Sequence, residues 1–171
     1  PSLIEQGLLR GEAHPRRLGV IEKHPWLASQ QRLTFSRVGR IDPLDLGDYL
    51  GHGGYRGLRR ALEIGPAATV QQVIDSGLRG RGGAAFPTGV KWQTVATQQA
   101  APKFIACNAD EGDSGTFSDR MLMEGDPFQL LEGMAIAGLA VGAAQGYIYV
   151  RSEYPHAVAA LNAALAVAED Y

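Results

Sequence analysis

The fold is decided by residues 103–151, KFIACNADEGDSGTFSDRMLMEGDPFQLLEGMAIAGLAVGAAQGYIYVR. This stretch opens with a short apolar run at 103–107 and closes with a second at 146–151, and each has the composition of a buried strand. Between them the sequence predicts a helix from Asp126 to about Ala143, with a proline in its first turn and many alanines and glycines. Strand, helix and strand in this order favour a right-handed crossover and a parallel sheet. We therefore expect an α/β fold, a Rossmann-like open sheet with parallel strands and flanking helices.

The remaining sequence adds helices before this stretch and one after it. Thr69 is the predicted N-cap of a helix that Gly77 closes. Further helical segments are predicted at 45–50, 55–63, 87–97 and from Pro155 onward. Several prolines and the lack of a sustained periodicity predict an extended N-terminal arm over residues 1–54, which leaves 55–171 as the main domain.

The composition is that of a globular protein. Apolar residues make up 45% of the chain and charged residues 20%. The formal net charge of −2 provides neither a basic stripe for nucleic acid nor a polybasic segment for an anionic membrane. No membrane span or signal peptide is recognisable, so we expect a soluble, cytoplasmic protein. Because the chain begins at Pro1 and ends at Tyr171 inside a helical pattern, we interpret it as a piece of something longer.

No metal site or nucleophile stands out. Cys107 is the single cysteine, which excludes an internal disulfide and an all-cysteine cluster, and it is predicted to be a small buried hydrophobe. Ser114 lacks the G-x-S-x-G context and an identifiable base. Arg151 and Glu153 are interpreted as an ordinary exposed pair. The histidines have no metal-ligand spacing: His14, His24, His52 and His156.

A polar, acidic loop, NADEGDSGTFSDR at 108–120, follows the first predicted strand. Ligands of open parallel sheets collect at the carboxyl ends of strands. The groups able to hydrogen-bond ribose or ribityl hydroxyls and a polar heteroaromatic edge are Asn108, Asp110, Glu111 and Asp113. An EF-hand calcium loop counted from Asp110 is excluded, because its third and twelfth positions are Gly112 and Met121. The alternative is a solvated turn that caps the helix behind it.

A glycine-dense loop, GLRGRGGAAFPTGVKWQ at 77–93, is suited to a phosphorylated cofactor. Glycines let backbone N–H groups approach an anion, and the N-terminus of the following helix favours an anion at the same place. The residues concerned are three glycines, a helix-starting proline and two cations: Gly80, Gly82, Gly83, Pro87, Arg81 and Lys91.

The glycine loop matches neither of two common phosphate-binding patterns. Residues 80–85 satisfy G-x-G-x-x-A, but the dinucleotide fingerprint requires a strand before the loop, and a helix is predicted there. A Walker A loop requires adjacent Gly-Lys-Ser/Thr, whereas Gly89 is followed by Val90 and then Lys91. We expect a phosphate-binding loop of another kind.

Together, the two loops resemble the FMN-binding flavoprotein subunit of the NADH-dehydrogenase family. This family comprises the 51 kDa-type subunit of respiratory complex I and relatives in NAD-dependent formate dehydrogenases and NAD-reducing hydrogenases. GRGGAAFPTGVKW and CNADEGDSGTFSDR are similar to its two signature segments, and IYVRSEYPHA to the segment after them. The resemblance covers residues 55–171, and the arm looks most like the formate dehydrogenase beta and hydrogenase diaphorase branch.

The resemblance implies residue roles. FMN would be held by Gly80, Arg81, Gly82, Gly83 and Lys91, with Asn108, Asp110 and Glu111 at its ribityl chain and ring. Phe86 would stack on NADH, and Asp113 would place a carboxylate near the adenosine ribose that favours NADH over NADPH. Ala85 stands where the family has glycine, Ser114 where it has proline, and Thr94 where some relatives have a second stacking aromatic.

The resemblance also implies the function. The full protein would move hydride between NAD(H) and FMN and pass electrons between FMN and iron–sulfur clusters, in a formate dehydrogenase or related complex. The cofactor performs this chemistry, so no catalytic side chain is assigned, although Glu111 would lie near the flavin. The implied partners are a thioredoxin-like iron–sulfur subunit and further subunits of an electron-transfer complex. The family's downstream ubiquitin-like domain and helical bundle with a 4Fe–4S cluster are absent here, so this fragment alone is expected to be inactive.

Three alternatives remain at the level of sequence. The first is the flavin subunit of an NADH–quinone oxidoreductase, that is, complex I. The second is the related membrane electron-transfer subunit of sodium-pumping complexes, which shares a GGAGFPT-like loop. The third is a non-catalytic interaction fragment that docks onto a thioredoxin-like iron–sulfur subunit without binding FMN.

Overall fold

The computed structural model describes residues 19–20, 23–113 and 115–171. The chain separates into two units, and the second runs from Thr34 to Tyr171. The first unit carries a short helix, α1 (Pro25–Ala28), with no buried residue. Two residues considered in the sequence, His14 and Ser114, lie outside the described residues, as does most of the first half of the predicted arm.

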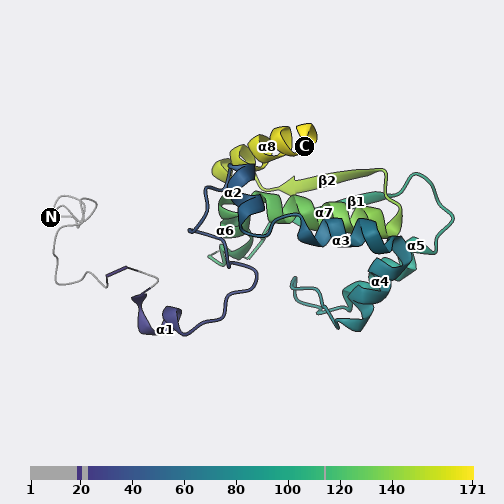
Figure 1. The fold of residues 1–171 in the computed structure, drawn as a ribbon, viewed down its shortest axis with the longest axis horizontal. Coiled ribbons are helices and arrows are strands. Elements are labelled where there is room, and N and C mark those ends of the chain that lie inside the picture. Colours follow the sequence, from purple (N-terminus) through teal and green to yellow (C-terminus); the bar gives the residue numbers. More distant parts are fainter. Residues whose placement is uncertain (1–18, 21–22, 114) are drawn as a thin grey trace. The chain divides into compact units, whose positions relative to one another are not determined.

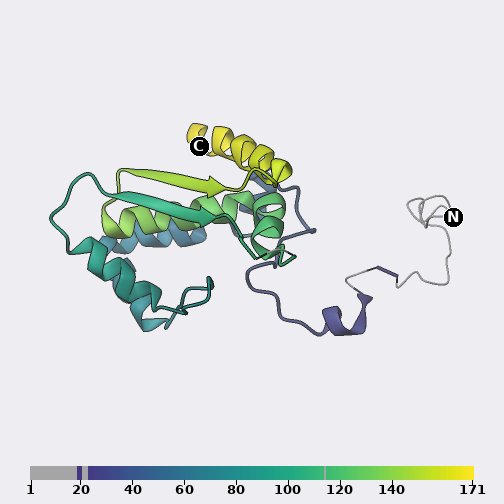
Figure 2. The ribbon, with the colours of Figure 1, turned by 180° about the vertical axis from the view of Figure 1, so that it is seen from behind.

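The second unit contains seven helices and two strands among its described residues (Figures 1 and 2). The helices are α2 (Leu46–Gly51), α3 (Arg56–Ile64), α4 (Pro66–Asp75), α5 (Thr88–Ala96), α6 (Ser118–Gly125), α7 (Pro127–Val141) and α8 (Pro155–Asp170). The strands are β1 (Phe104–Ala109) and β2 (Gln145–Val150). Each predicted element is therefore confirmed to within a few residues. No helix in the described ranges has the length and hydropathy that crossing a bilayer requires.

The two strands pair in parallel, from Phe104 opposite Gln145 to Ala109 opposite Val150. This pairing confirms the predicted α/β class with parallel strands, and the long helix α7 lies between the strands in sequence. Side chains alternate across the sheet, because successive strand residues point to opposite faces. One face packs into a core formed by Ala109, Met123, Tyr154, Ala157 and Leu161, with Cys107, Leu130, Ile148 and Val150 against it.

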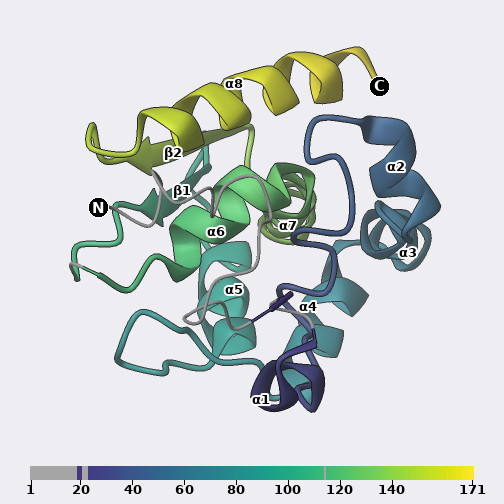
Figure 3. The same ribbon diagram turned by 90° about the vertical axis from the view of Figure 1, so that its left-hand side faces the viewer.

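Helix α7 is the centre of the second unit. It contacts both strands and the helices α3, α4, α5, α6 and α8. Figure 3 shows α7 with α8 above it, α2 and α3 to one side and α4 and α5 below. The small residues Ala137 and Ala140 are buried along it, so its neighbours pack closely around it.

Residues 34–54 pack within this unit, whereas the predicted arm runs to residue 54. Arg37 donates through Nε to the Asp126 carboxylate at 2.8 Å, and its guanidinium lies 4.7 Å from the centre of the Tyr49 ring. Tyr49 is fully buried and joins a second core with Ile41, Tyr55, Phe128 and Ala164. Residues 34–54 therefore contribute side chains to the same core as the domain predicted at 55–171.

The structure corrects three local predictions. Thr69 is not a helix cap, because α4 begins at Pro66 and the Thr69 hydroxyl donates to the Gly65 carbonyl at 2.8 Å. Asn108 belongs to β1 rather than to the loop after it. The end of the predicted loop is the helix α6, which begins at Ser118. The sequence showed no cap for α6 because the capping group lies several residues upstream.

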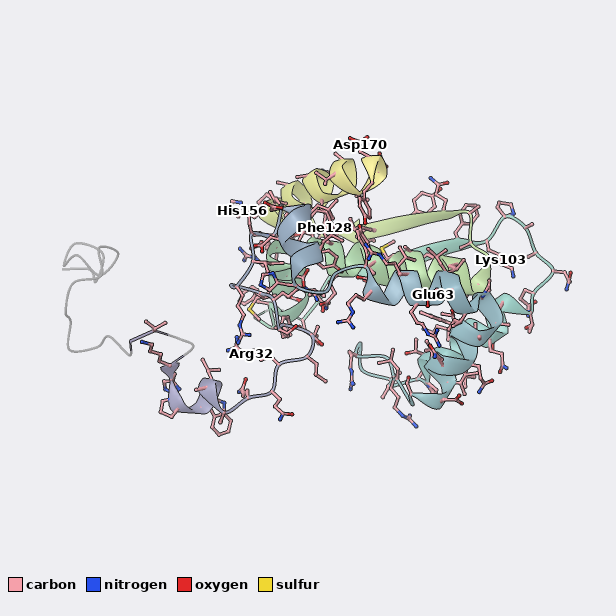
Figure 4. All side chains as sticks on the ribbon, in the orientation of Figure 1. Arg32, Glu63, Lys103, Phe128, His156 and Asp170 are labelled. Carbon is pink, nitrogen blue, oxygen red and sulfur yellow. The ribbon has the colours of Figure 1, made fainter. Side chains whose placement is uncertain are left out.

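Lys103 joins the C-termini of two helices, and we expect its loss to destabilise the chain. Its ammonium group donates to the carbonyl of Ala96 at the end of α5, at 3.0 Å, and to that of Val141 at the end of α7, at 3.1 Å. Figure 4 labels Lys103 at the end of α7 that lies away from Phe128. Hydrogen bonds from a charged donor to helix-terminal carbonyls contribute about 1–3 kcal/mol.

Lys103→Met is therefore expected to lower the free energy of unfolding by about 1–3 kcal/mol, measured by urea denaturation. Lys91→Met is the matched control, since Lys91 is exposed on α5 and its replacement should change stability by less than about 0.5 kcal/mol. Equal stabilities of the two variants would contradict the double capping role.

Candidate functional site

The glycine loop connects α4 to α5 and is closed at its base by backbone hydrogen bonds. Arg79 and Pro87 form an antiparallel bridge, in which Gly80 N donates to Phe86 O at 2.9 Å and Thr88 N donates to Leu78 O at 2.8 Å. These bonds fix both ends of the loop, while residues 80–86 are exposed. The closure brings the end of α4 and the start of α5 close together at the base of the loop.

Three residues of the loop adopt left-handed backbone conformations, and the first of them, Gly77 with φ +66°, directly follows the C-cap residue of α4. Gly83 has φ +114°, which glycine tolerates without a steric penalty, whereas Gly80 and Gly82 do not enter this region. Ala85 has φ +50°, and its carbonyl accepts a hydrogen bond from the Arg79 guanidinium at 3.0 Å. A Cβ atom added at Gly82 or Gly83 would meet nothing within 4 Å, so the backbone there is open to a ligand.

The charges beside the loop are exposed. Arg81 lies within it, and Lys91 lies in the first turns of α5, where Lys91 N donates to Pro87 O at 3.2 Å. Phe86, at the end of the loop, is 50% exposed and so presents an uncovered aromatic ring. Exposed cations, open backbone and a helix N-terminus at one place are the features that an anionic group needs.

The acidic loop leaves the carboxyl end of β1. Asp110 N donates to the Asn108 side-chain oxygen at 3.2 Å, which folds the backbone into a turn. Asn108 and Asp110 line an open groove of about 430 Å³ together with Tyr147 and Tyr149 from β2. The two tyrosines are 54% and 68% exposed, so this face of the sheet is uncovered in the described chain.

Glu111 follows in a left-handed conformation, with φ +49°. Its carboxylate accepts from the backbone N–H groups of Asp119 and of Arg120, the latter at 3.2 Å, and from the Tyr154 hydroxyl at 2.9 Å. The two backbone donors are at the N-terminus of α6, where a carboxylate stabilises a helix. Glu111 therefore caps the following helix, which is one part of the predicted alternative, although its side chain is half-buried rather than solvated.

Several ionisable groups near this loop have shifted pKa values. Burial, together with the negative charge of Asp119, raises the pKa of the Cys107 thiol, so this group stays protonated and behaves as an apolar side chain. Burial and then the Glu111 carboxylate raise the pKa of Asp119. Burial and the hydrogen bond to Glu111 raise the pKa of Tyr154, which keeps its hydroxyl a donor.

The two loops project from the same side of the second unit. Figure 3 shows the glycine loop below the acidic loop, on the same side of the ribbon. Within the described ranges, no group of three or more His, Cys, Asp or Glu side chains is arranged to hold a metal ion. The arrangement offers a cationic, glycine-rich loop and an amide-and-carboxylate loop.

Comparison with known protein families decides the family. The model of the Nuo51 FMN-binding domain of the complex I 51 kDa subunit matches residues 73–171. The chain belongs to this family. The matched part contains both loops, the sheet and α8, which confirms the resemblance expected from GRGGAAFPTGVKW and CNADEGDSGTFSDR.

Individual relatives agree with this assignment. The chain is 47% identical over 142 residues to the NADP-reducing hydrogenase subunit HndC of Solidesulfovibrio fructosivorans, covering 83% of this chain and 29% of that protein. It is 50% identical over 126 residues to an NADH-quinone oxidoreductase subunit of Rhizobium meliloti (strain 1021), covering 73% of this chain and 30% of that protein. The chain therefore spans less than a third of the length of these relatives.

A solved structure supports the fold. The crystal structure of NAD+-reducing [NiFe]-hydrogenase in the H2-reduced state matches 72% of this chain and 22% of its own chain, with a TM-score of 0.64 and 38% sequence identity. The parallel strand pair and its flanking helices are thus those of the 51 kDa flavoprotein family.

The residues present fit the FMN that the family description names. An exposed loop with a left-handed glycine, open backbone and two cations suits its phosphate, and the groove at Asn108 and Asp110 offers hydrogen-bonding groups for its hydroxyls and ring. Ala85, at the position where the resemblance leads us to expect glycine, has the left-handed φ that glycine favours. The expected glycine-to-alanine difference therefore falls at a position whose backbone conformation strains any residue with a Cβ atom.

Sequence reasoning missed two residues of this region. Arg151 is not an ordinary exposed pair with Glu153, because its side chain is 22% exposed and donates to the Glu111 carbonyl at 3.0 Å as well as to Glu153 at 3.2 Å. Tyr154 is buried against the same loop, with a relative exposure of 5%. The tyrosine directly before the helix-starting Pro155 is the one sequence feature that marks this position. No sequence pattern links it to Glu111, which is 43 residues earlier in the chain.

Proposed function

We propose that the protein containing this chain is the flavoprotein subunit of an NAD-dependent oxidoreductase that passes electrons to iron–sulfur clusters of partner subunits. The observation that carries this proposal is the closed, cationic glycine loop, which projects from the same side as the acidic loop in a chain of the FMN-binding family. Bound FMN would supply hydride acceptance and one-electron transfer, which no protein side chain provides.

The chain's own residues bind and orient in this proposal. The backbone of Gly80, Gly82 and Gly83 and the charges of Arg81 and Lys91 hold the cofactor phosphate. Asn108 and Asp110 bind the ribityl chain and the polar edge of the ring. The Glu111 carboxylate already accepts three hydrogen bonds from the protein, so we assign it to the shape of the acidic loop.

Phe86 and Asp113 are the proposed contacts to the pyridine dinucleotide. The half-exposed Phe86 ring is available for stacking, and Asp113 is exposed in the acidic loop. A carboxylate beside the adenosine ribose disfavours a 2′-phosphate, so we propose NAD(H) as the substrate. The relative from Solidesulfovibrio fructosivorans is described as NADP-reducing, which makes this preference a point to test.

The proposal also covers the complex in which this protein works. The relatives are subunits of a hydrogenase and of NADH-quinone oxidoreductases, which supports an electron-transfer complex with several subunits. We propose a thioredoxin-like iron–sulfur subunit as the direct partner, and a cytoplasmic complex of the hydrogenase diaphorase or formate dehydrogenase type. A 4Fe–4S cluster is proposed for the part of the protein beyond this chain.

The test of the proposed function is the flavin content of the complete subunit. We expect denaturation of the purified protein to release yellow, fluorescent FMN in a ratio close to one per subunit. Lys91→Ala should weaken FMN binding by about 10-fold to 100-fold, because a charge-assisted hydrogen bond to phosphate is worth about 1.5–3 kcal/mol. Lys23→Ala is the matched control, since Lys23 is an exposed lysine outside the second unit.

Two outcomes would contradict the assignment. A colourless wild-type protein that still binds an iron–sulfur partner would support the interaction-fragment alternative. Unchanged FMN content and unchanged NADH oxidation with an artificial acceptor in Lys91→Ala would remove Lys91 from the site.

A further inference from the structure

The segment between β2 and α8 donates two hydrogen bonds to the acidic loop. Tyr154, which directly precedes α8, donates its hydroxyl to Glu111 Oε1 at 2.9 Å, and Arg151 Nη1 donates to the Glu111 main-chain carbonyl at 3.0 Å. One residue of the loop is therefore held through both its side chain and its backbone. Both donors come from a segment about 40 residues further along the chain.

Tyr154 is itself fixed in position. Its ring packs with Ala109, Met123 and Ala157 in the core beneath the sheet. The guanidinium carbons of Arg120 and Arg151 lie 5.4 and 5.3 Å from the centre of the ring. A ring packed into a core and contacted by two cations cannot change its rotamer without breaking several contacts.

Glu111 needs this support because its backbone is in the left-handed region, where residues with a Cβ atom are strained. Its remaining carboxylate oxygen accepts from the first backbone N–H groups of α6, at Asp119 and Arg120. Loss of either the Tyr154 or the Arg151 contact would release the turn toward a relaxed conformation. Asn108 and Asp110, immediately before the turn, would move with it, since Asp110 N is bonded to the Asn108 side chain.

We propose that Tyr154 and Arg151 are positioning residues of the flavin site, which hold the strained turn at Glu111 so that Asn108 and Asp110 face the cofactor. This proposal rests on the proposed function, because it takes Asn108 and Asp110 as FMN contacts. Neither Tyr154 nor Arg151 touches the cofactor in it. Their effect on the flavin passes through the backbone of Glu111.

Tyr154→Phe in the complete subunit is the principal test, since it removes the hydroxyl and keeps the packed ring. Without FMN, we expect amide hydrogen exchange at Asp119 and Arg120 and across residues 110–113 to become faster by about tenfold. We expect FMN to bind about tenfold more weakly, because the variant loses one hydrogen bond to a carboxylate. We also expect the visible absorption spectrum of the bound flavin to change. The free energy of global unfolding is measured for the same variant. If it falls too little to explain the faster exchange, the effect is local to the turn and not a general loss of stability.

Tyr171→Phe is the matched control, because the Tyr171 ring is 63% exposed and its hydroxyl accepts one hydrogen bond from Arg59, at 3.2 Å. It should change neither exchange at 110–120 nor FMN binding. Should Tyr154→Phe fail to fold, Arg151→Met replaces it, since Arg151 lies outside the core and its loss removes the bond to the Glu111 carbonyl. The same paired changes are expected for that variant.

The outcomes are distinguishable. Faster exchange with unchanged FMN affinity and spectrum would overturn the positioning role but leave the proposed function intact. Unchanged exchange in both variants would show that Tyr154 and Arg151 do not hold the turn, and would also overturn it. A wild-type protein that binds no FMN would overturn the proposed function and this proposal together, whatever the exchange data show.

Discussion

Replacing Glu132 with alanine is expected to lower the free energy of unfolding by about 3–5 kcal/mol, because each donor left without an acceptor costs about 1–3 kcal/mol, and this is a large part of the stability of a domain of this size. Glu132 is on α7 and is only 9% exposed. Its carboxylate accepts from the Tyr49 hydroxyl, from Tyr55 N at 2.8 Å and from Leu58 N at 3.0 Å. Removing it would leave two buried donors and one part-buried donor without an acceptor.

The reason for so large an effect is the position of these donors. Tyr55 N and Leu58 N are at the start of α3, so Glu132 caps that helix from a different helix. A Cβ atom at Gly57 would come within 3.0 Å of Glu132 Oε1, which shows how closely α3 approaches the carboxylate. Burial and the hydrogen bond to Glu132 raise the pKa of Tyr49, so its hydroxyl remains a donor at neutral pH.

Urea denaturation of the 171-residue chain, followed by circular dichroism, measures this change. The matched control is Glu63→Ala, because Glu63 is exposed on α3 and pairs with Arg60 at a distance of 3.4 Å. Its replacement should change stability by less than about 0.5 kcal/mol. A Glu132→Ala variant within about 1 kcal/mol of the wild type would show that water or another group satisfies the three donors.

Gly89→Ala is expected to disturb both the fold and the cofactor site. Gly89 is buried in the first turn of α5, and a Cβ atom there would lie 2.5 Å from the backbone nitrogen and 2.6 Å from the Cα of Ile74 in α4. Backbone atoms within a helix cannot move aside as a flexible side chain can, so the two helices must separate. Overpacking of this kind costs about 1–3 kcal/mol.

The separation would also alter the glycine loop, because α4 and α5 hold its two ends. The bonds that close the loop, Gly80 N to Phe86 O and Thr88 N to Leu78 O, depend on the approach of these helices. Because the loop would no longer be held in its binding conformation, we expect FMN binding by the complete subunit to weaken at least about tenfold. Quenching of flavin fluorescence measures this change.

Gly133→Ala supplies the control for this prediction. Gly133 is an exposed glycine within α7, and a Cβ atom there would meet nothing within 4 Å. Its replacement should leave FMN binding unchanged and stabilise the chain by up to about 1 kcal/mol, since alanine favours a helix. If Gly89→Ala bound FMN as tightly as Gly133→Ala, the spacing of α4 and α5 would not control the loop.

Features with a local signal were predictable from sequence. The strands at 104–109 and 145–150 and the helix between them follow from apolar runs and a helix-starting proline. Lys103 shows the limit of such signals, because its two carbonyl partners, Ala96 and Val141, end helices that are distant from each other in sequence. The helix α6 was missed for the same reason, since its capping carboxylate belongs to Glu111 and not to the residue before it.

By itself the sequence determined the class of fold, the family, and the two loops that suit a phosphorylated flavin, because each of these is written in consecutive residues. Only the tertiary structure decided how the loops are held. Tyr49 and Glu132 are 83 residues apart, and Glu111 and Tyr154 are 43 apart, so no local pattern connects them. A buried carboxylate takes whichever donors the packed helices bring to it, and this choice is made when the chain is folded.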